Sequence, residues 1–158
     1  MTPIMLQRFL VEDLGELFDG FKLKNPVNGE LVAITVYPQY LPAPTAGIEN
    51  PVKFPHLRVI VLEGEDPNAV DPHKCGIFVQ VSVWDDSPDY QGFVDAVNLV
   101  TRIYQHWMNV KVFDNQFEVD YPVRWKIHED NNYPYFFAGI TADWIVGKAL
   151  RKETDFDL

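Results

Sequence analysis

The amino-acid sequence predicts an α+β fold: an antiparallel β-sheet of about five to six strands with two main helices packed on one side. Two observations lead to this prediction. Apolar residues recur at helical spacing in two segments, and each of these helical segments precedes stretches that alternate or are rich in β-branched residues. The resulting order of helix, three strands, helix, three strands is typical of α+β domains. We expect one such domain over residues 1–146, followed by a polar C-terminal tail over 147–158.

The first helix is expected over residues 3–20. Thr2 can cap its N-terminus, and Pro3 suits the first helical position because proline has no amide hydrogen to leave unpaired. Gly20 is a suitable stop. The residues predicted to form its buried face are Leu6, Leu10, Leu14, Leu17 and Phe21.

The first strand is predicted at LVAITVY (31–37), and an irregular segment follows it over residues 38–55. This segment contains five prolines, which lack the amide donor that helices and sheets require. Irregular stretches of this length are uncommon inside compact domains and are usually functional or ordered by a partner. The next strands, LRVIVLE (57–63) and IFVQVSVW (77–84), should pair as a hairpin with a long polar loop.

The second helix is predicted over residues 87–107, with Ser87 as the cap and Pro88 at its first position. Its apolar stripe comprises Phe93, Val97, Val100, Tyr104 and Trp107.

Three strands complete the predicted domain, at residues 110–113, 117–127 and 136–146. Pro122 interrupts the middle one and must lie at a bulge or an edge. Alternation in the last strand places Phe136, Ile140 and Trp144 on the core face, and Asp130 begins the turn before it.

Composition argues against several classes of function. Twenty-three acidic and thirteen basic residues give a net charge of −10, which disfavours a protein that grips nucleic-acid phosphates. One cysteine allows no intrachain disulfide. No apolar run approaches the ~20 residues of a membrane span, so we expect a soluble protein made in a reducing compartment.

Candidate catalytic and metal-binding groups are sparse. His73 and Cys75 lie two residues apart, but a zinc site needs three or four ligands, and we expect both to be solvated loop residues. Acids cluster at strand ends, as at Asp85-Asp86 and Glu129-Asp130, where they normally mark the exit to solvent. No phosphate-binding loop, dinucleotide fingerprint or hydrolase motif is present. We therefore predict no cofactor and no enzymatic activity, with a carboxylate-based hydrolase as the least favoured alternative.

Several segments together resemble one family. LRVIVLEGED (57–66), IFVQVSVW with its following acids, DYQGFVDAVNLVTRI (89–103) and FEVDYPVRWKIHEDNNYPYFFAGITADW (117–144) occur in the order seen in tail completion proteins of tailed phages and prophages, relatives of tail terminator proteins. The resemblance covers roughly residues 30–146. Its most specific part is the turn and YPY segment, and the first helix and the proline-rich loop match less clearly.

This resemblance implies a structural protein of the virion, located at the tail or neck and assembled in the cytoplasm of a bacterial host. Family members form a ring, usually a hexamer, that caps the tail tube and offers a surface to the head-completion or connector protein. DNA would pass through such a ring without specific binding, and the acidity of the chain suits that passage. No catalytic residue, metal or cofactor is implied.

The expected subunit contacts lie in two regions. The proline-rich segment would act as an arm, and the end of the sheet near residue 133 would supply a second patch, because exposed aromatic anchors often dominate contact energies. Alternatives are another neck or head-completion connector, and a monomeric ligand- or peptide-binding module. The residues predicted to make the contacts are Tyr37, Tyr40, Leu41, Phe54, Glu129, Tyr133, Pro134 and Tyr135.

Overall fold

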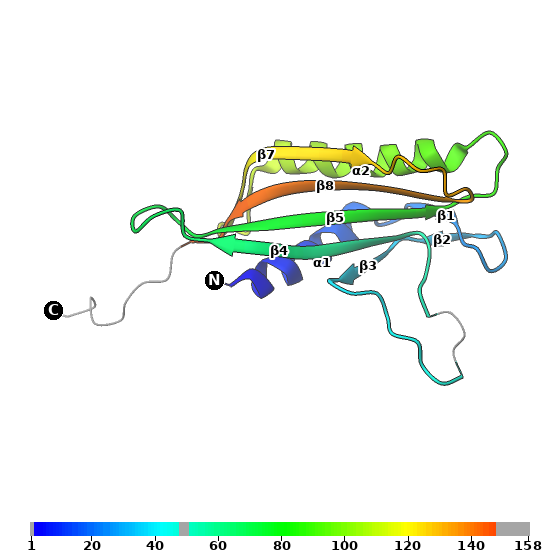
Figure 1. Ribbon diagram of the computed structural model, residues 1–158, viewed down its shortest axis with the longest axis horizontal. Coiled ribbons are helices and arrows are strands. Elements are labelled where there is room, and N and C mark those ends of the chain that lie inside the picture. The colour runs from blue at the N-terminus through cyan, green and yellow to red at the C-terminus, as the bar shows by residue number, and fades with distance from the viewer. Residues whose placement is uncertain (1, 48–50, 148–158) are drawn as a thin grey trace.

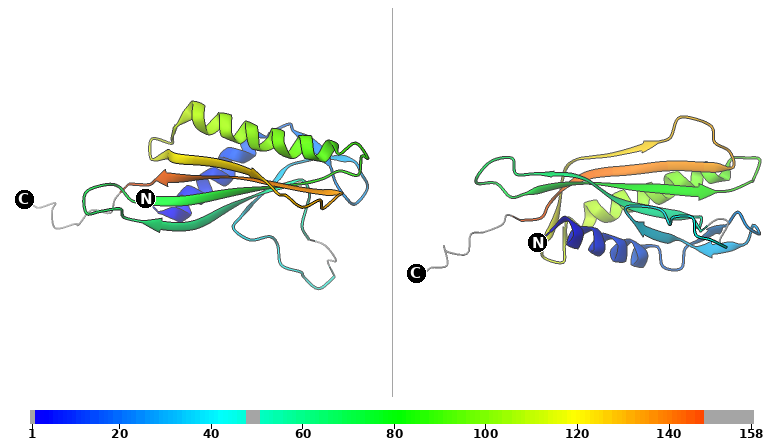
Figure 2. Two further views of the ribbon diagram at one scale, coloured as in Figure 1. Left: turned by 45° about the horizontal axis from the view of Figure 1, so that its top comes forward. Right: turned by 60° about the horizontal axis from the view of Figure 1, so that its bottom comes forward.

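The computed structural model describes residues 2–47 and 51–147 and has the predicted α+β arrangement (Figure 1). A six-stranded sheet has the order β3-β4-β5-β8-β7-β6, and a second sheet pairs β1 with β2. Both helices lie on one face of the large sheet (Figure 2). The elements are α1 (Pro3–Leu17), β1 (Lys22–Lys24), β2 (Leu31–Ala33), β3 (Thr35–Pro38), β4 (His56–Glu65), β5 (Lys74–Trp84), α2 (Gln91–Val110), β6 (Val112–Phe113), β7 (Phe117–Ile127) and β8 (Tyr135–Ile145).

Helix α1 begins as predicted and ends three residues earlier than predicted. The Thr2 hydroxyl accepts a hydrogen bond from the Met5 amide at 3.2 Å, and Pro3 occupies the first turn. Its leucines at helical spacing, Leu6, Leu10 and Leu14, are fully buried. Phe21 lies beyond the helix and is exposed, because the chain turns through Gly20 at a φ of +84°.

The large sheet is mixed, which corrects the prediction of a purely antiparallel sheet. The expected strand at residues 31–37 is divided into β2, which pairs with the unpredicted β1, and β3, which pairs with β4. The β3–β4 pairing is parallel, with Thr35 opposite His56. The chain between the two strands returns to the end of the sheet at which β3 begins. Strand β4 therefore starts beside the first residue of β3 and runs in the same direction.

Strands β4 and β5 form the predicted antiparallel hairpin and extend further than predicted. Leu57 pairs with Val81 and Val59 with Val79, and all four side chains are buried beneath the helices. Cys75 also lies in β5 and is fully buried, so the prediction of a solvated loop residue is wrong for it. Burial raises the pKa of its thiol.

Helix α2 begins at Gln91, four residues later than predicted. Ser87 does not cap it: the N-cap residue is Tyr90, at a φ of 60°, and the Ser87 hydroxyl accepts from the Lys24 ammonium at 3.2 Å. Two residues of the predicted stripe, Phe93 and Tyr104, are exposed, and two others, Val100 and Trp107, are buried as predicted. The buried face consists of Gly92, Ala96, Leu99, Val100, Ile103 and Trp107.

The last strands complete the core. Ile140 and Trp144 of β8 are fully buried as predicted, and the Trp144 ring lies edge-on to Trp107 of α2 with centroids 5.2 Å apart. The register of β7 shifts between Asp120 and Arg124, which places Pro122 at an irregularity of the pairing, in agreement with the predicted bulge or edge position. None of the described helices has the length and apolar composition needed to cross a membrane.

Candidate functional site

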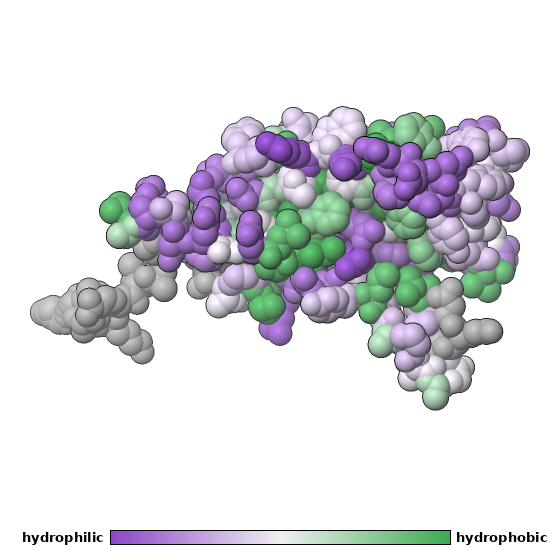
Figure 3. Space-filling model, viewed as in Figure 1, coloured by the Kyte–Doolittle hydropathy of each residue, from purple (hydrophilic) through white to green (hydrophobic). Residues whose placement is uncertain are grey.

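The face of the large sheet that points away from the helices carries an apolar patch at its centre (Figure 3). Ile60 of β4 pairs with Phe78 of β5 on this face, and the neighbouring Leu62 is 56% exposed. Phe78 lies against the backbone of β8, since a Cβ atom added at Gly139 would stand 2.1 Å from its ring. Apolar side chains rimmed by polar ones in this way are typical of surfaces that contact other molecules.

One end of this face is an aromatic cluster, which we define as Tyr37, Phe54, His56, Tyr135 and Phe137. The Phe54 ring centroid lies 4.6 Å from His56 and 5.2 Å from Tyr135. The Tyr37 ring centroid lies 5.5 Å from that of His56, and the Tyr135 ring stacks on that of Phe137. The fold therefore brings together three of the predicted contact residues, which come from β3, the segment before β4, and β8.

His56 fixes the base of the arm, which we define as the described residues 39–47 and 51–55. The His56 side chain is buried, and its Nδ1 lies 2.8 Å from the carbonyl oxygen of Lys53. Burial lowers the pKa of His56, so the ring is neutral near pH 7 and Nδ1–H can donate to that carbonyl. The Lys53 amide in turn donates to the Tyr37 hydroxyl at 3.0 Å. These bonds hold the C-terminal end of the arm against the sheet.

The remaining predicted contact residues lie in two places. On the arm, Tyr40 is 76% exposed and Leu41 is half-buried. At the β7–β8 turn, Glu129 is exposed, and the Tyr133 hydroxyl donates to the carbonyl of Asp86.

The Tyr133–Pro134 pair is thereby attached to the loop before α2 rather than to the arm. The Tyr133 ring lies 5.5 Å from that of Tyr90, and the Pro134 carbonyl accepts from the Asp85 amide at 2.9 Å. Tyr135, through its contact with Phe54, connects this turn to the base of the arm.

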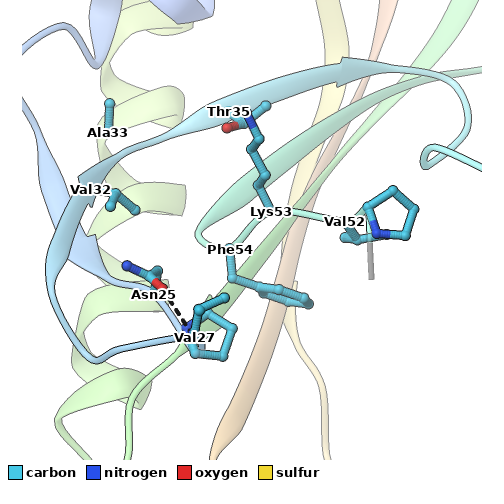
Figure 4. A pocket seen from close by; sticks show the side chains of 10 residues that line it. Asn25, Val27, Val32, Ala33, Thr35, Val52, Lys53 and Phe54 are labelled. Carbon is cyan, nitrogen blue, oxygen red and sulfur yellow. Dashed lines mark hydrogen bonds between the residues drawn. The ribbon is translucent and has the colours of Figure 1, made fainter. Parts of the chain in front are cut away.

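A groove of about 700 Å³ opens between the arm and the β1–β2 hairpin (Figure 4). Its volume is comparable to that of pockets that hold drug-sized ligands. Lys53 extends along it toward Thr35 at the start of β3. No described acidic side chain lies within ion-pair distance of the Lys53 ammonium. The apolar lining includes Val27, Val32, Ala33, Val52 and Phe54.

The acids at the strand ends serve structural contacts where the chain is described. Burial alone would raise the pKa of Asp85, but hydrogen bonds from Ser87 and the charge of Lys24 hold that pKa below its ordinary value. Lys24 also lies 3.6 Å from both Asp85 and Asp86 and so connects β1 to the loop before α2. Within residues 2–47 and 51–147, no group of three or more His, Cys, Asp or Glu side chains could hold a metal ion.

Comparison with known proteins places the chain in no family. No protein-family model matches it, and no curated protein matches its sequence at a significant level. The interpretation of the site therefore depends on its residues: an apolar sheet face, an aromatic cluster and a groove that contains Lys53, features that are common in binding surfaces.

Sequence reasoning did not identify two parts of this site. His56 stands alone at the start of a strand, and only its burial in the folded chain shows its role. The groove joins residues 25–33 to residues 51–54, which no sequence spacing connects. The proline content of the arm was a signal for this region, and Phe54 was the one residue of the groove lining that the sequence analysis predicted as a contact residue.

Proposed function

We propose that this protein is a structural subunit of a tailed phage or prophage, a tail terminator or tail completion protein that assembles with copies of itself into a ring. The observation that carries the proposal is the uncovered face of the large sheet, which continues through the aromatic cluster into the arm. A closed ring needs two different complementary patches on every subunit. The apolar centre of the uncovered face is our candidate for one such patch, and the arm beyond the aromatic cluster is our candidate for the other.

The predicted partners follow from this role. The ring, expected to be a hexamer, would cap the tail tube on one side and meet the head-completion or connector protein on the other. The net charge of −10 supports a channel through which DNA passes without being held, because acidic side chains repel phosphate. A ring with a strongly basic channel wall would contradict this part of the proposal.

The groove favours a second candidate, a monomeric module that binds a peptide or small ligand. It is concave and mostly apolar and contains one cationic side chain, Lys53, which are common features of ligand sites. Another neck or head-completion role would share the assembly behaviour of the first proposal.

Light scattering after gel filtration separates these possibilities. The terminator proposal predicts a closed oligomer, or a monomer that forms rings when the tail-tube protein of the same source is added. A chain that stays monomeric with that tube protein would support the binding module instead. The identity of the neighbouring genes gives an independent check, because capsid and tail-tube genes should flank a terminator gene.

A further inference from the structure

We infer that the groove between the arm and the β1–β2 hairpin binds residues 153–158 of a neighbouring copy of this chain. The inference rests on the proposed function, because it assigns one of the contacts that would close the ring. Three features carry it: the chemistry of the groove, the pattern of residues 153–158, and the distance between the two along one subunit.

The groove suits an occupant that is apolar and negatively charged. Its walls are apolar where Val27, Val32 and Val52 line it. The ammonium of Lys53 lies among them without an ion pair to any described residue. A carboxylate placed beside Lys53 would satisfy this charge, and apolar side chains would fill the remaining volume.

Residues 153–158, with the sequence ETDFDL, match both requirements. Acids at positions 153, 155 and 157 alternate with Thr154, Phe156 and Leu158. In an extended chain, successive side chains point to opposite sides. Such a segment can therefore direct Phe156 and Leu158 into the groove while Asp155 and Asp157 remain at its rim, within reach of the Lys53 ammonium.

The same segment of the same chain would have to run back along the whole length of β8 to reach the groove. Strand β8 ends beside β5, where the Val146 amide donates to the His73 carbonyl. The groove lies at the other end of β8, where Phe54 contacts Tyr135 (Figure 1).

The span to be covered can be estimated from chain geometry. The eleven residues of β8 are roughly 33 Å long at the usual rise per residue. Phe156 follows Gly147 by nine residues, which reach about 30 Å even when fully extended. A neighbouring copy has no such restriction. A contact between residues 153–158 of one copy and the groove of the next is heterologous, the kind of contact that generates rings.

Zero-length carbodiimide crosslinking of the full chain tests this assignment. An equal mixture of ¹⁴N- and ¹⁵N-labelled chains is crosslinked and digested, and mass spectrometry identifies the linked peptides. We expect Lys53 to be joined to Asp155 or Asp157 in mixed-isotope pairs, which only two different copies can give. Links within one isotope alone, or no link at Lys53, would overturn the inference.

A charge exchange provides the second test. Lys53→Glu should weaken self-association roughly tenfold, and adding Asp155→Lys and Asp157→Lys to that variant should restore it. Lys22→Glu is the matched control, because Lys22 is also exposed but lies outside the groove lining. Thermal melts should show that all variants remain folded.

The two proposals can fail separately. If the unmodified chain forms rings, and Lys53→Glu and Phe156→Ala assemble as well as it does, this inference is wrong and the proposed function stands. If the unmodified chain forms no rings even with the tail-tube protein of the same source present, and gives no mixed-isotope links, both are wrong.

Discussion

Gly139→Ala should destabilise the protein, although alanine normally suits a strand better than glycine. Gly139 lies in β8 opposite Gln80, on the uncovered face, and the Phe78 ring covers it. An added Cβ would stand 2.1 Å from Phe78 Cε1 and 2.5 Å from Cζ. Carbon atoms pack at roughly 3.5 Å or more, so the ring must move by about 1.4 Å.

The magnitude follows from two opposing effects. Overpacking of this kind costs typically about 1–3 kcal/mol. Replacing glycine in a strand recovers about 0.5–1 kcal/mol of backbone entropy. Because the clash involves only one side chain, removing that side chain should change the sign of the effect. We therefore expect Gly139→Ala to cost about 1–2 kcal/mol in the unmodified chain and to be neutral or stabilising in a Phe78→Ala background.

Urea unfolding of the unmodified chain, the two single variants and the double variant measures the coupling energy between positions 78 and 139. The expected coupling energy is about 1–3 kcal/mol. If Gly139→Ala costs the same in both backgrounds, the Phe78 ring does not rest on Gly139. The apolar patch on the uncovered face would then have a different shape from the one described above.

Two titrating groups and one aromatic pair give further predictions. Burial lowers the pKa of His56 below the ordinary 6.5. The unfolded chain then binds this proton more tightly, so the free energy of unfolding should fall as pH drops below 6.5, and His56→Gln should reduce that slope in thermal melts. The hydrogen bond from Lys74, at 2.8 Å, lowers the pKa of Asp120 below 3.8. The contribution of this pair to the free energy of unfolding should be present above pH 3.8 and be lost as the pH falls below it. In acid denaturation curves, Asp120→Asn should make the free energy of unfolding depend less steeply on pH in this range. Alanine at both Tyr133 and Tyr135 should weaken self-association in light scattering more than it lowers the unfolding midpoint; a double variant that does not fold would assign these residues to the core.

The sequence predicted those features of the fold that depend on neighbouring residues alone. The leucine spacing of α1 identified its buried face because a helix repeats every 3.6 residues whatever it packs against. Alternation identified Ile140 and Trp144 because successive side chains of a strand point to opposite faces of the sheet. Pro122 predicted a bulge because a missing amide donor must be accommodated locally.

The features that the sequence did not predict depend on contacts between distant segments. The parallel pairing of β3 with β4 follows from the path of the arm, which no periodicity encodes. Helix α2 starts late, with Tyr90 as its N-cap, and the Ser87 hydroxyl that was predicted to cap it accepts instead from Lys24, which is distant in the sequence. Of the predicted contact residues, Phe54 and Tyr135 meet because the fold places the first residues of β4 and β8 at the same end of the sheet.

Electron microscopy of tail tubes tests the central proposal most directly. The tail-tube protein of the same source would be polymerised with and without the full chain. The proposal predicts a ring at one end of each tube and arrest of tube growth at that end, with Lys22→Glu behaving as the unmodified chain does. Tubes that grow to the same length distribution and carry no added density at either end would contradict it.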